Sequence, residues 1–330
     1  KLGDETWDRA MKMKEMDEIE KENFKALGRI QIFLSNPFTD EKHLKEQQEK
    51  QLKDKCLKLL QQYTKHPIVK ITNSGDTAIF GALSIAKQHG CKEVLIPDQG
   101  GWLSYKTFPK LLDMQIIQLK TTYGVIDPVV LNTEVNHHKN AALLFASFAG
   151  YAAPQDIEEI ANICKENNIL MIEDASGALT HELLCNGNLS DIIVGSFGKW
   201  KIADVGYGGF LSAEHHLVTE RVKESDIFSL IKSTNMNYTL LFEKLKAAPQ
   251  RLQFILKKTK EIKALCKKEH FRMIHENEEG LSIFVKWENE EEKEKILQFC
   301  KSHHLEYKEC PLYIKVLEKA ISIEVKRLRE

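Results

Sequence analysis

The amino-acid sequence predicts an α/β fold with a mainly parallel central sheet covered by helices, followed by a smaller α+β domain. Strand and helix patterns alternate as β-α-β-α-β from about residue 68 to residue 200, which is typical of a parallel sheet buried on both faces. After about residue 215 the glycine-rich turns disappear and charge-rich helices alternate with short strands. We therefore expect an N-terminal helical arm over residues 1–30, a large domain over 31–215 and a small C-terminal domain over 216–330.

The composition is that of a soluble globular protein, with 42% hydrophobic and 29% charged residues. The 47 basic residues nearly balance the 48 acidic ones, so bulk charge gives no reason to expect a nucleic acid or an anionic membrane as partner. No apolar run approaches the roughly 20 residues needed to cross a bilayer, and no secretion signal opens the chain. These observations predict a cytoplasmic protein without a membrane span.

Cysteine and histidine spacing argues against disulfides and metal sites. The 7 cysteines are scattered without a C-x-x-C pair, which indicates a reducing compartment and mostly buried thiols. The 12 histidines include adjacent pairs such as His137-His138, whose side chains point apart on regular elements. We therefore expect no bound metal.

The N-terminal third of the chain holds a possible anion site. Residues 1–30 suit a loosely amphipathic packing or dimer-contact arm, and a turn at 36–40 opens a charged helix to about residue 63. A strand at 68–72 then leads through the polar turn 73–77 into a helix over 78–89. A helix N-terminus after a small polar turn attracts anions, although Ser74-Gly75-Asp76 alone is a weak signal, because such a sequence also caps helices that bind no ligand.

The middle of the chain continues the alternation. A strand at 94–97 runs into Asp98-Gln99-Gly100-Gly101-Trp102, followed by a helix at 104–112 and a strand at 116–119. The position of Trp102 suits either stacking on a planar cofactor or packing in the core. A strand at 142–148 and a helix at 157–167 come next.

Two further strands end in residues that carry chemistry. The strand at 169–172 ends in Glu173-Asp174, and the strand at 192–194 runs into Ser196-Phe197, then Lys199 and Lys201, and a glycine cluster at 206–209. Ligands of open α/β sheets bind at the carboxyl ends of the strands. A lysine and an aspartate there suit pyridoxal 5′-phosphate (PLP), which needs a Schiff-base lysine and a carboxylate that keeps its ring nitrogen protonated.

The C-terminal part reads as a small α+β unit. Residues 223–268 are predicted to be helical, 281–287 to form a strand and 290–303 to form a helix. Short strands are expected at 313–316 and 321–325.

Taken together, these motifs resemble the DegT/DnrJ/EryC1/StrS sugar aminotransferases, which are fold-type-I PLP-dependent enzymes, over roughly residues 30–240. Residues 74–78 are similar to the family's S-G-T-x-A phosphate turn, and residues 169–178 to its strand ending in E-D-A-A-Q-A. Ser196-Phe197 with Lys201 resembles S-F-x-x-x-K, and residues 206–209 resemble G-E-G-G with Tyr207 in place of glutamate.

The resemblance implies a role for each matching residue. Lys201 would be the catalytic Schiff-base lysine, chosen over Lys199 by the family spacing, and we expect burial and the cationic ring to lower its pKa. The cofactor-binding residues would be Asp174 at the ring nitrogen, Ser74, Gly75, Asp76, Thr77 and Ser196 at the phosphate, Trp102 on the ring, and Asn237 toward the neighbouring subunit's cofactor. The implied protein is a homodimeric PLP-dependent aminotransferase with glutamate as donor and a nucleotide-linked keto sugar as acceptor.

Three departures from the family pattern leave alternatives open. Gly177 stands where the family has a glutamine that contacts the cofactor's 3-hydroxyl, the turn at 98–101 differs, and the substrate-loop histidines have no counterpart near Cys310. The alternatives are a PLP enzyme that catalyses dehydration, elimination or transfer to a non-sugar substrate, and a non-catalytic binding subunit that keeps the fold.

Overall fold

The computed structural model describes residues 37–219, 222, 231–233 and 235–329, so the arm predicted over residues 1–30 lies outside the described residues. The chain divides into two compact units, Lys1–Leu52 and Lys53–Glu330, and the long helix α2 (Pro37–Thr64) contributes residues to both. The second unit contains the two sheets and the candidate site.

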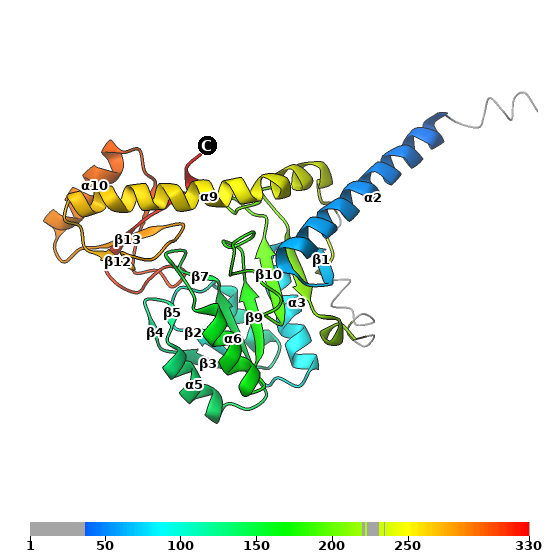
Figure 1. The fold of residues 1–330 in the computed structure, drawn as a ribbon, viewed down its shortest axis with the longest axis horizontal. Helices are drawn as coiled ribbons and strands as arrows, with labels where there is room; N and C mark the ends of the chain where they lie inside the picture. The colour runs from blue at the N-terminus through cyan, green and yellow to red at the C-terminus, as the bar shows by residue number, and fades with distance from the viewer. Residues whose placement is uncertain (1–36, 220–221, 223–230, 234, 330) are drawn as a thin grey trace, which may run out of the picture. The chain divides into compact units, whose positions relative to one another are not determined.

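The central sheet has seven strands in the order β1-β11-β10-β9-β6-β2-β3 (Figure 1). Only β11 runs against its neighbours, β1 and β10, and the other neighbouring pairs are parallel. The predicted mainly parallel sheet is therefore confirmed. Its strands are β1 (Ile68–Thr72), β2 (Glu93–Pro97), β3 (Gln115–Leu119), β6 (Ala141–Ala146), β9 (Leu170–Asp174), β10 (Ile192–Ser196) and β11 (Gly209–Ala213).

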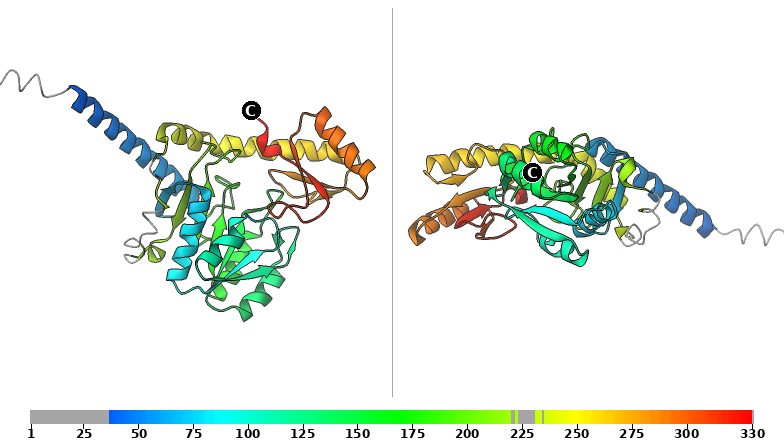
Figure 2. Two further views of the ribbon diagram at one scale, coloured as in Figure 1. Left: turned by 180° about the vertical axis from the view of Figure 1, so that it is seen from behind. Right: turned by 90° about the horizontal axis from the view of Figure 1, so that it is seen from below.

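Helices cover both faces of this sheet. Helices α3 (Gly75–Gln88) and α4 (Ser104–Leu111) lie over one face, and α5 (Pro128–His137) and α6 (Ile157–Glu166) lie over the other (Figure 2). The inner strands are almost continuously apolar because both of their faces are buried, as in β6, where Ala141 to Phe145 are fully buried. All seven cysteines are buried and free, as expected.

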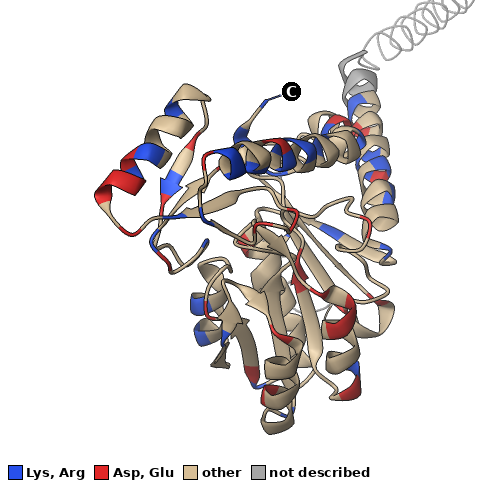
Figure 3. Ribbon diagram, turned by 60° about the vertical axis from the view of Figure 1, so that its left-hand side comes forward, with Lys and Arg blue, Asp and Glu red and all other residues tan. Residues whose placement is uncertain are grey.

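A second, antiparallel sheet follows near the C-terminus. Its order is β12 (Met273–Ile274), β13 (Ile283–Lys286), β15 (Ala320–Ile323) and β14 (Tyr307–Glu309), and α10 (Glu290–Ser302) belongs to the same region. Helix α9 (Tyr238–Lys268) runs from the central sheet to this second sheet (Figure 1). Lysines and arginines recur along α9, whereas the central strands carry few charges (Figure 3). None of the described helices has both the length and the apolarity needed to cross a membrane.

Some local predictions need correction. The strand predicted at 313–316 is wrong: Leu312 N–H donates to Val316 O at 2.9 Å and Lys315 N–H donates to Leu312 O at 2.8 Å, so this segment is a tight turn. Within the predicted 223–268 helix, residues 238–268 form α9 and residues 223–230 lie outside the described residues. Several short elements had not been predicted: β4 (Thr121–Thr122), β5 (Val125–Ile126), β7 (Phe148–Ala149), β8 (Ala153–Pro154), η1 (His215–Leu217) and η2 (Val325–Arg327).

Candidate active site

The turn between β1 and α3 places a helix N-terminus at the carboxyl edge of the central sheet. Ser74 caps α3: its Oγ accepts a hydrogen bond from Thr77 N–H at 3.1 Å, and Thr77 Oγ1 accepts from Ser74 N–H at 2.9 Å. Gly75 packs so closely against the end of β10 that a Cβ there would lie 2.7 Å from Ser196 Cβ. Ser74, Gly75, Asp76 and Ser196 therefore form one wall at the positive end of a helix dipole, which favours an anion.

Asp174 is the last residue of β9, and its buried carboxylate is held by two donors. Oδ2 accepts a hydrogen bond from the Tyr105 hydroxyl at 2.8 Å, and Oδ1 accepts from Ser176 N–H at 3.0 Å. Burial and the adjacent Asp174 carboxylate raise the pKa of Tyr105 well above its usual value, so this hydroxyl stays protonated and remains a donor. The Asp174 carboxylate is thus fixed in orientation.

Lys201 lies on a loop between β10 and β11 that is closed by hydrogen bonds. Phe197 N–H donates to Gly208 O at 2.9 Å, and the Asp204 carboxylate accepts from Trp200 N–H at 2.7 Å. Short loops that are cross-linked in this way hold a side chain in a defined position. The structure therefore presents Lys201 from a fixed loop at the same edge of the sheet as Asp174.

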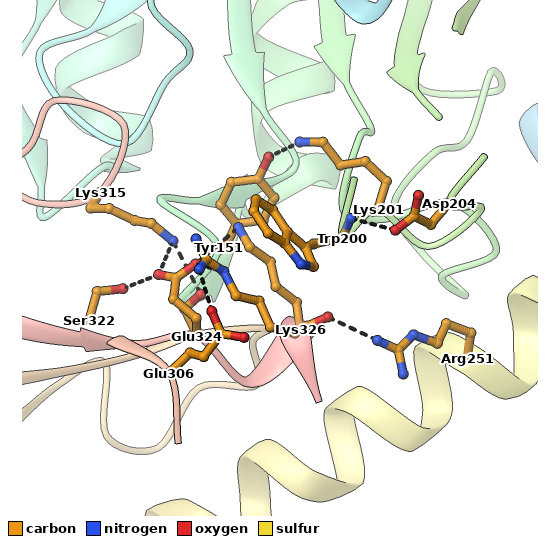
Figure 4. A network of polar contacts seen from close by, with 12 residues as sticks. Tyr151, Trp200, Lys201, Asp204, Arg251, Glu306, Lys315, Ser322, Glu324 and Lys326 are labelled. Carbon is orange, nitrogen blue, oxygen red and sulfur yellow. Dashed lines mark hydrogen bonds and ion pairs between the residues drawn. The ribbon is translucent and has the colours of Figure 1, made fainter. Parts of the chain in front are cut away.

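The amine of Lys201 is surrounded by aromatic rings and carboxylates. Nζ donates a hydrogen bond to the Tyr151 hydroxyl (Figure 4) and lies 5.3 Å from the centroid of the Trp102 ring. Burial lowers the pKa of Lys201, but Tyr151, Asp174 and Asp76 outweigh it, so the pKa lies above its usual value. The expected lowering by burial is therefore present, but within the chain the net shift of this pKa is upward, and the lowering expected from the cationic ring stays a prediction.

Trp102 packs in the core, which was one of its two predicted roles, and stacking on a cofactor stays a prediction. Its ring packs against the apolar core and also lines the cavity beside Lys201. Its Nε1 donates to Asp76 Oδ1 at 2.9 Å, which ties the loop after β2 to the turn before α3. The aromatic face of Trp102 is thereby oriented by a hydrogen bond to the proposed phosphate wall.

These groups converge on a single cavity of about 300 Å³. Among the predicted site residues, it is lined by Ser74, Gly75, Asp76, Trp102, Asp174, Ser196 and Lys201. Thr77 does not line this cavity and acts as the partner in the capping box. Asn237 lies elsewhere, as the N-cap of α9, where its Oδ1 accepts from Leu240 N–H at 3.0 Å. Lys199 is exposed and does not line this cavity.

Tyr151 is the main site residue that the sequence analysis missed. It lies between β7 and β8 in a left-handed conformation with φ 74°, an uncommon backbone state for a residue with a side chain. Its backbone carbonyl accepts hydrogen bonds from Leu281 N–H at 2.7 Å and Ser282 N–H at 2.9 Å, which tie it to the C-terminal region. A Cβ at Gly177 would lie 3.1 Å from the Tyr151 ring, so the glycine leaves room for this tyrosine.

Comparison with solved structures identifies the fold as that of the fold-type-I PLP-dependent enzymes. Alanine–glyoxylate aminotransferase from Nostoc sp. is 14% identical with a TM-score of 0.65, over 83% of this chain and 81% of that chain. A variant of serine palmitoyltransferase from S. paucimobilis with PLP and myriocin bound is 13% identical with a TM-score of 0.65, over 83% and 71%. Ureidoglycine–glyoxylate aminotransferase from Bacillus subtilis is 15% identical with a TM-score of 0.61, over 83% and 78%.

The family follows from the sequence match. Residues 51–247 match the model of the DegT/DnrJ/EryC1/StrS aminotransferase family, and the chain belongs to this family. Residues 253–330 match a different model, the MJ1341 family C-terminal domain. The search of curated proteins gave no match.

The cofactor of this enzyme is PLP, and the cavity has a donor set that suits it. The wall at Ser74–Asp76 and Ser196 offers an anion site, Asp174 offers a fixed buried carboxylate, and Trp102 offers an aromatic face. The Lys201 amine completes the set. The protein is a PLP-dependent enzyme of the aminotransferase type.

Proposed function

We propose that this protein transfers an amino group from an amino acid to a keto substrate, with Lys201 as the covalent anchor of PLP and as the proton carrier. The observation that carries the proposal is the convergence of the Lys201 amine, the Asp174 carboxylate and the Ser74–Asp76 turn on one cavity. Each of these groups comes from the carboxyl edge of the central sheet, where α/β folds bind their ligands.

The proposed binding roles follow from the chemistry of each group. Ser74, Gly75, Ser196 and the backbone of Asp76 hold the phosphate, with Thr77 supporting the turn through the capping box. Asp174 holds the ring nitrogen in its protonated form, and Trp102 lies against the ring. Asn237 would contact the cofactor phosphate of a neighbouring subunit, as the family resemblance implies.

Proton transfer is assigned to Lys201. When bound, PLP supplies an electron sink for the pair of electrons left when the donor carbon loses its proton. The Lys201 amine takes that proton as a general base and delivers it back as a general acid. The Tyr151 hydroxyl, which accepts a hydrogen bond from Nζ, orients the amine and stabilises its ammonium form. Tyr105 and Ser176 keep the Asp174 carboxylate fixed throughout.

The substrates are proposed from the family alone. Glutamate is the proposed donor and a nucleotide-linked keto sugar the proposed acceptor. We further propose that a homodimer completes each site, since Asn237 lies outside the cavity of its own chain. We place the reaction in the cytoplasm, because the cysteines are free and buried and suit a reducing compartment.

A second candidate keeps PLP and Lys201 but uses a non-sugar substrate or a different reaction, such as elimination. It is favoured by the C-terminal region: the aminotransferase family match ends at residue 247, and residues 253–330 match another domain model. The presence of Lys201 and Asp174 in one cavity favours either enzyme over a non-catalytic binding subunit.

The test is the donor half-reaction of the PLP-loaded protein. Mixing with L-glutamate should convert the PLP absorbance band to that of pyridoxamine phosphate and should release one keto acid per site. A panel of other amino acids serves as comparison. Product formation without any build-up of pyridoxamine phosphate would overturn transamination in favour of the second candidate, and no spectral change with any amine would exclude both.

A further inference from the structure

A second cavity, of about 490 Å³, adjoins Lys201, and its lining combines aromatic and aliphatic side chains with six basic residues and one acidic residue. It shares Trp102, Tyr151 and Lys201 with the first cavity, so the two meet at the Lys201 amine. The acidic residue in its lining is Glu324, and the basic ones are Lys199, Lys201, Lys308, Lys315, Lys326 and Arg327. This imbalance of charge beside the reacting lysine needs an explanation.

The innermost cations are buried and share one carboxylate. The side chains of Lys315, Lys326 and Glu324 are 3%, 10% and 2% exposed. Lys315 Nζ lies 2.7 Å from Glu324 Oε1, and Lys326 Nζ lies 3.6 Å from Glu324 Oε2 (Figure 4). Two lysine amines and, at 3.8 Å, the Nε of Arg327 therefore share a single buried carboxylate, which can balance only one positive charge.

Such an excess is costly, because a buried charge needs a partner. Burial and the neighbouring Lys315 hold the pKa of Lys326 well below its usual value. Burial raises the pKa of Glu324, but Lys315 and Lys326 outweigh it and bring that pKa to about 2. Glu324 is therefore ionised at neutral pH, and an anion bound beside Lys326 would favour the charged form of this lysine and balance it.

Arg327 adds a donor that lacks an acceptor. Its Nε is buried, lies 3.8 Å from Glu324 Oε2, and makes no hydrogen bond within the described part of the chain. Its NH1 lies 2.6 Å from Glu306 Oε2, and its guanidinium lies 4.0 Å from the centroid of the Trp200 ring. These contacts fix the side chain at the wall of the cavity and leave a buried N–H available.

Tyr151 connects the cluster to the reacting lysine. Lys326 Nζ lies 3.3 Å from the centroid of the Tyr151 ring, and Lys201 Nζ lies 4.9 Å from the same centroid. The Lys326 backbone is also held, since Arg251 NH2 donates to its carbonyl at 2.9 Å. One small molecule can therefore place a reacting carbon at Lys201 and an anionic group at Lys326.

We propose that Lys315, Lys326 and Arg327 form an anion subsite that binds a carboxylate or phosphate group of the substrate beside Lys201. The substrate class is then a small acid, such as an amino acid with its keto acid, or a phosphorylated keto compound. The link to the reaction rests on the proposed function, whereas anion binding itself does not depend on transamination.

The test measures binding of anions that cannot react. The PLP-loaded protein, whose phosphate wall is filled, is titrated by calorimetry with glutarate and separately with inorganic phosphate. Lys326→Met should weaken binding about tenfold or more, the scale of one lost charge-assisted hydrogen bond. Lys308→Met, at an exposed lysine of the same cavity, should change it less than about twofold on that scale. Tighter binding of glutarate assigns the subsite to a carboxylate, and tighter binding of phosphate assigns it to a phosphoryl group.

Thermal stability separates a binding role from a structural one. Without added anion, Lys326→Met should melt no lower than the wild-type protein, because Lys315 and Glu324 then balance. Lys326→Arg should keep anion binding. If Lys326→Met fails to fold, Arg327→Gln is the second variant and should also weaken anion binding. The proposed subsite is refuted if the anions bind equally well to the wild-type protein, Lys326→Met and Arg327→Gln. It is also refuted if they do not bind to the wild-type protein. Anion binding without any amine transfer would instead refute the proposed function alone.

Discussion

The buried carboxylate near Lys201 and the buried carboxylate of Glu324 differ in the groups that balance them. Asp174 is a buried acid whose two oxygens each accept a hydrogen bond from a neutral donor, at 2.8 and 3.0 Å. Glu324 is also buried, but it faces two lysines at 2.7 and 3.6 Å and cannot neutralise both. In the first region neutral donors satisfy the carboxylate, whereas in the second region three basic groups share one carboxylate that can balance only one positive charge.

This difference parallels the sequence matches. The first region lies within residues 51–247, which match the aminotransferase family, and the second lies within residues 253–330, which match another domain. Groups that bind a common cofactor need the same chemistry in every relative, whereas groups that contact the substrate vary with it. We therefore interpret the central sheet as the cofactor side of the site and the C-terminal cluster as the substrate side.

The largest expected effect comes from Lys201→Ala. Loss of the amine should reduce the donor half-reaction on the order of 10³-fold or more, because anchor and proton carrier are removed together. Lys199→Ala is the matched control on the same loop. Lys199 is exposed at the second cavity and lies outside the proposed anion subsite, so the rate should stay within about twofold. A Lys201→Ala protein that still transaminates at the wild-type rate would refute the assignment.

Glu324→Gln tests the electrostatics of the substrate side. Removing the single buried carboxylate should lower the free energy of unfolding at pH 7 by about 3 kcal/mol, because both lysines lose their partner. The folded-state pKa of about 2 lies below the usual 4.5, so this contribution is present above pH 4.5 and is lost as the pH falls toward 2.

The control for this substitution is Glu318→Gln. Glu318 forms an exposed ion pair with Lys286 at 2.8 Å, and its loss should cost less than about 1 kcal/mol. Denaturant unfolding at several pH values measures both variants. Equal losses for the two, or a loss for Glu324→Gln that persists unchanged at pH 2, would contradict the description of the cluster.

Asp174→Asn tests the cofactor side. Asparagine keeps the size of the side chain but removes the charge, so the ring nitrogen would lose its carboxylate partner. We expect PLP still to bind and the rate of the half-reaction to fall about 10²-fold. Tyr105→Phe removes only the 2.8 Å hydrogen bond to the same carboxylate and should cost about tenfold. If Tyr105→Phe proved as damaging as Asp174→Asn, the charge would not be the important property of Asp174.

Tyr151→Phe should have the smallest effect. It removes the hydroxyl that helps to raise the pKa of Lys201, so this pKa should fall and more of the amine should be unprotonated at a given pH. The pH dependence of PLP attachment should therefore move to lower pH. Stopped-flow absorbance between pH 6 and 10 measures the profile. An unchanged profile would show that Tyr151 does not control the protonation of Lys201.

The fold was predictable because its signals are local. Three features could be recognised from a few consecutive residues each: the apolar strands that alternate with helices, the Ser74 cap, and the residues after β9 and β10. The four family motifs then placed Lys201 and Asp174 in one site, and the structure brings both to the same cavity.

The contacts between residues that are far apart in the sequence were not predictable. Tyr151 reaches Lys201 from 50 residues away, and nothing in its immediate neighbours signals that contact. Lys315, Glu324 and Lys326 look like solvated charges in the sequence, but all three are buried, and Lys315 and Lys326 lie over the Tyr151 ring. The segment 313–316 was predicted to be a strand because it is mostly apolar, but it forms a turn. The backbone carbonyl of Lys315 in this turn lies so close to Gly150 that no residue with a Cβ fits there.

The most direct test of the account is borohydride reduction of the PLP-loaded protein followed by peptide mass mapping. Reduction fixes the cofactor to the lysine that carries it, and the peptide identifies that lysine. We predict a single modified residue, Lys201, and no label in the Lys201→Ala protein. A label on Lys199, Lys315 or Lys326 would contradict the central claim that the cofactor is anchored between Trp102 and the end of β9.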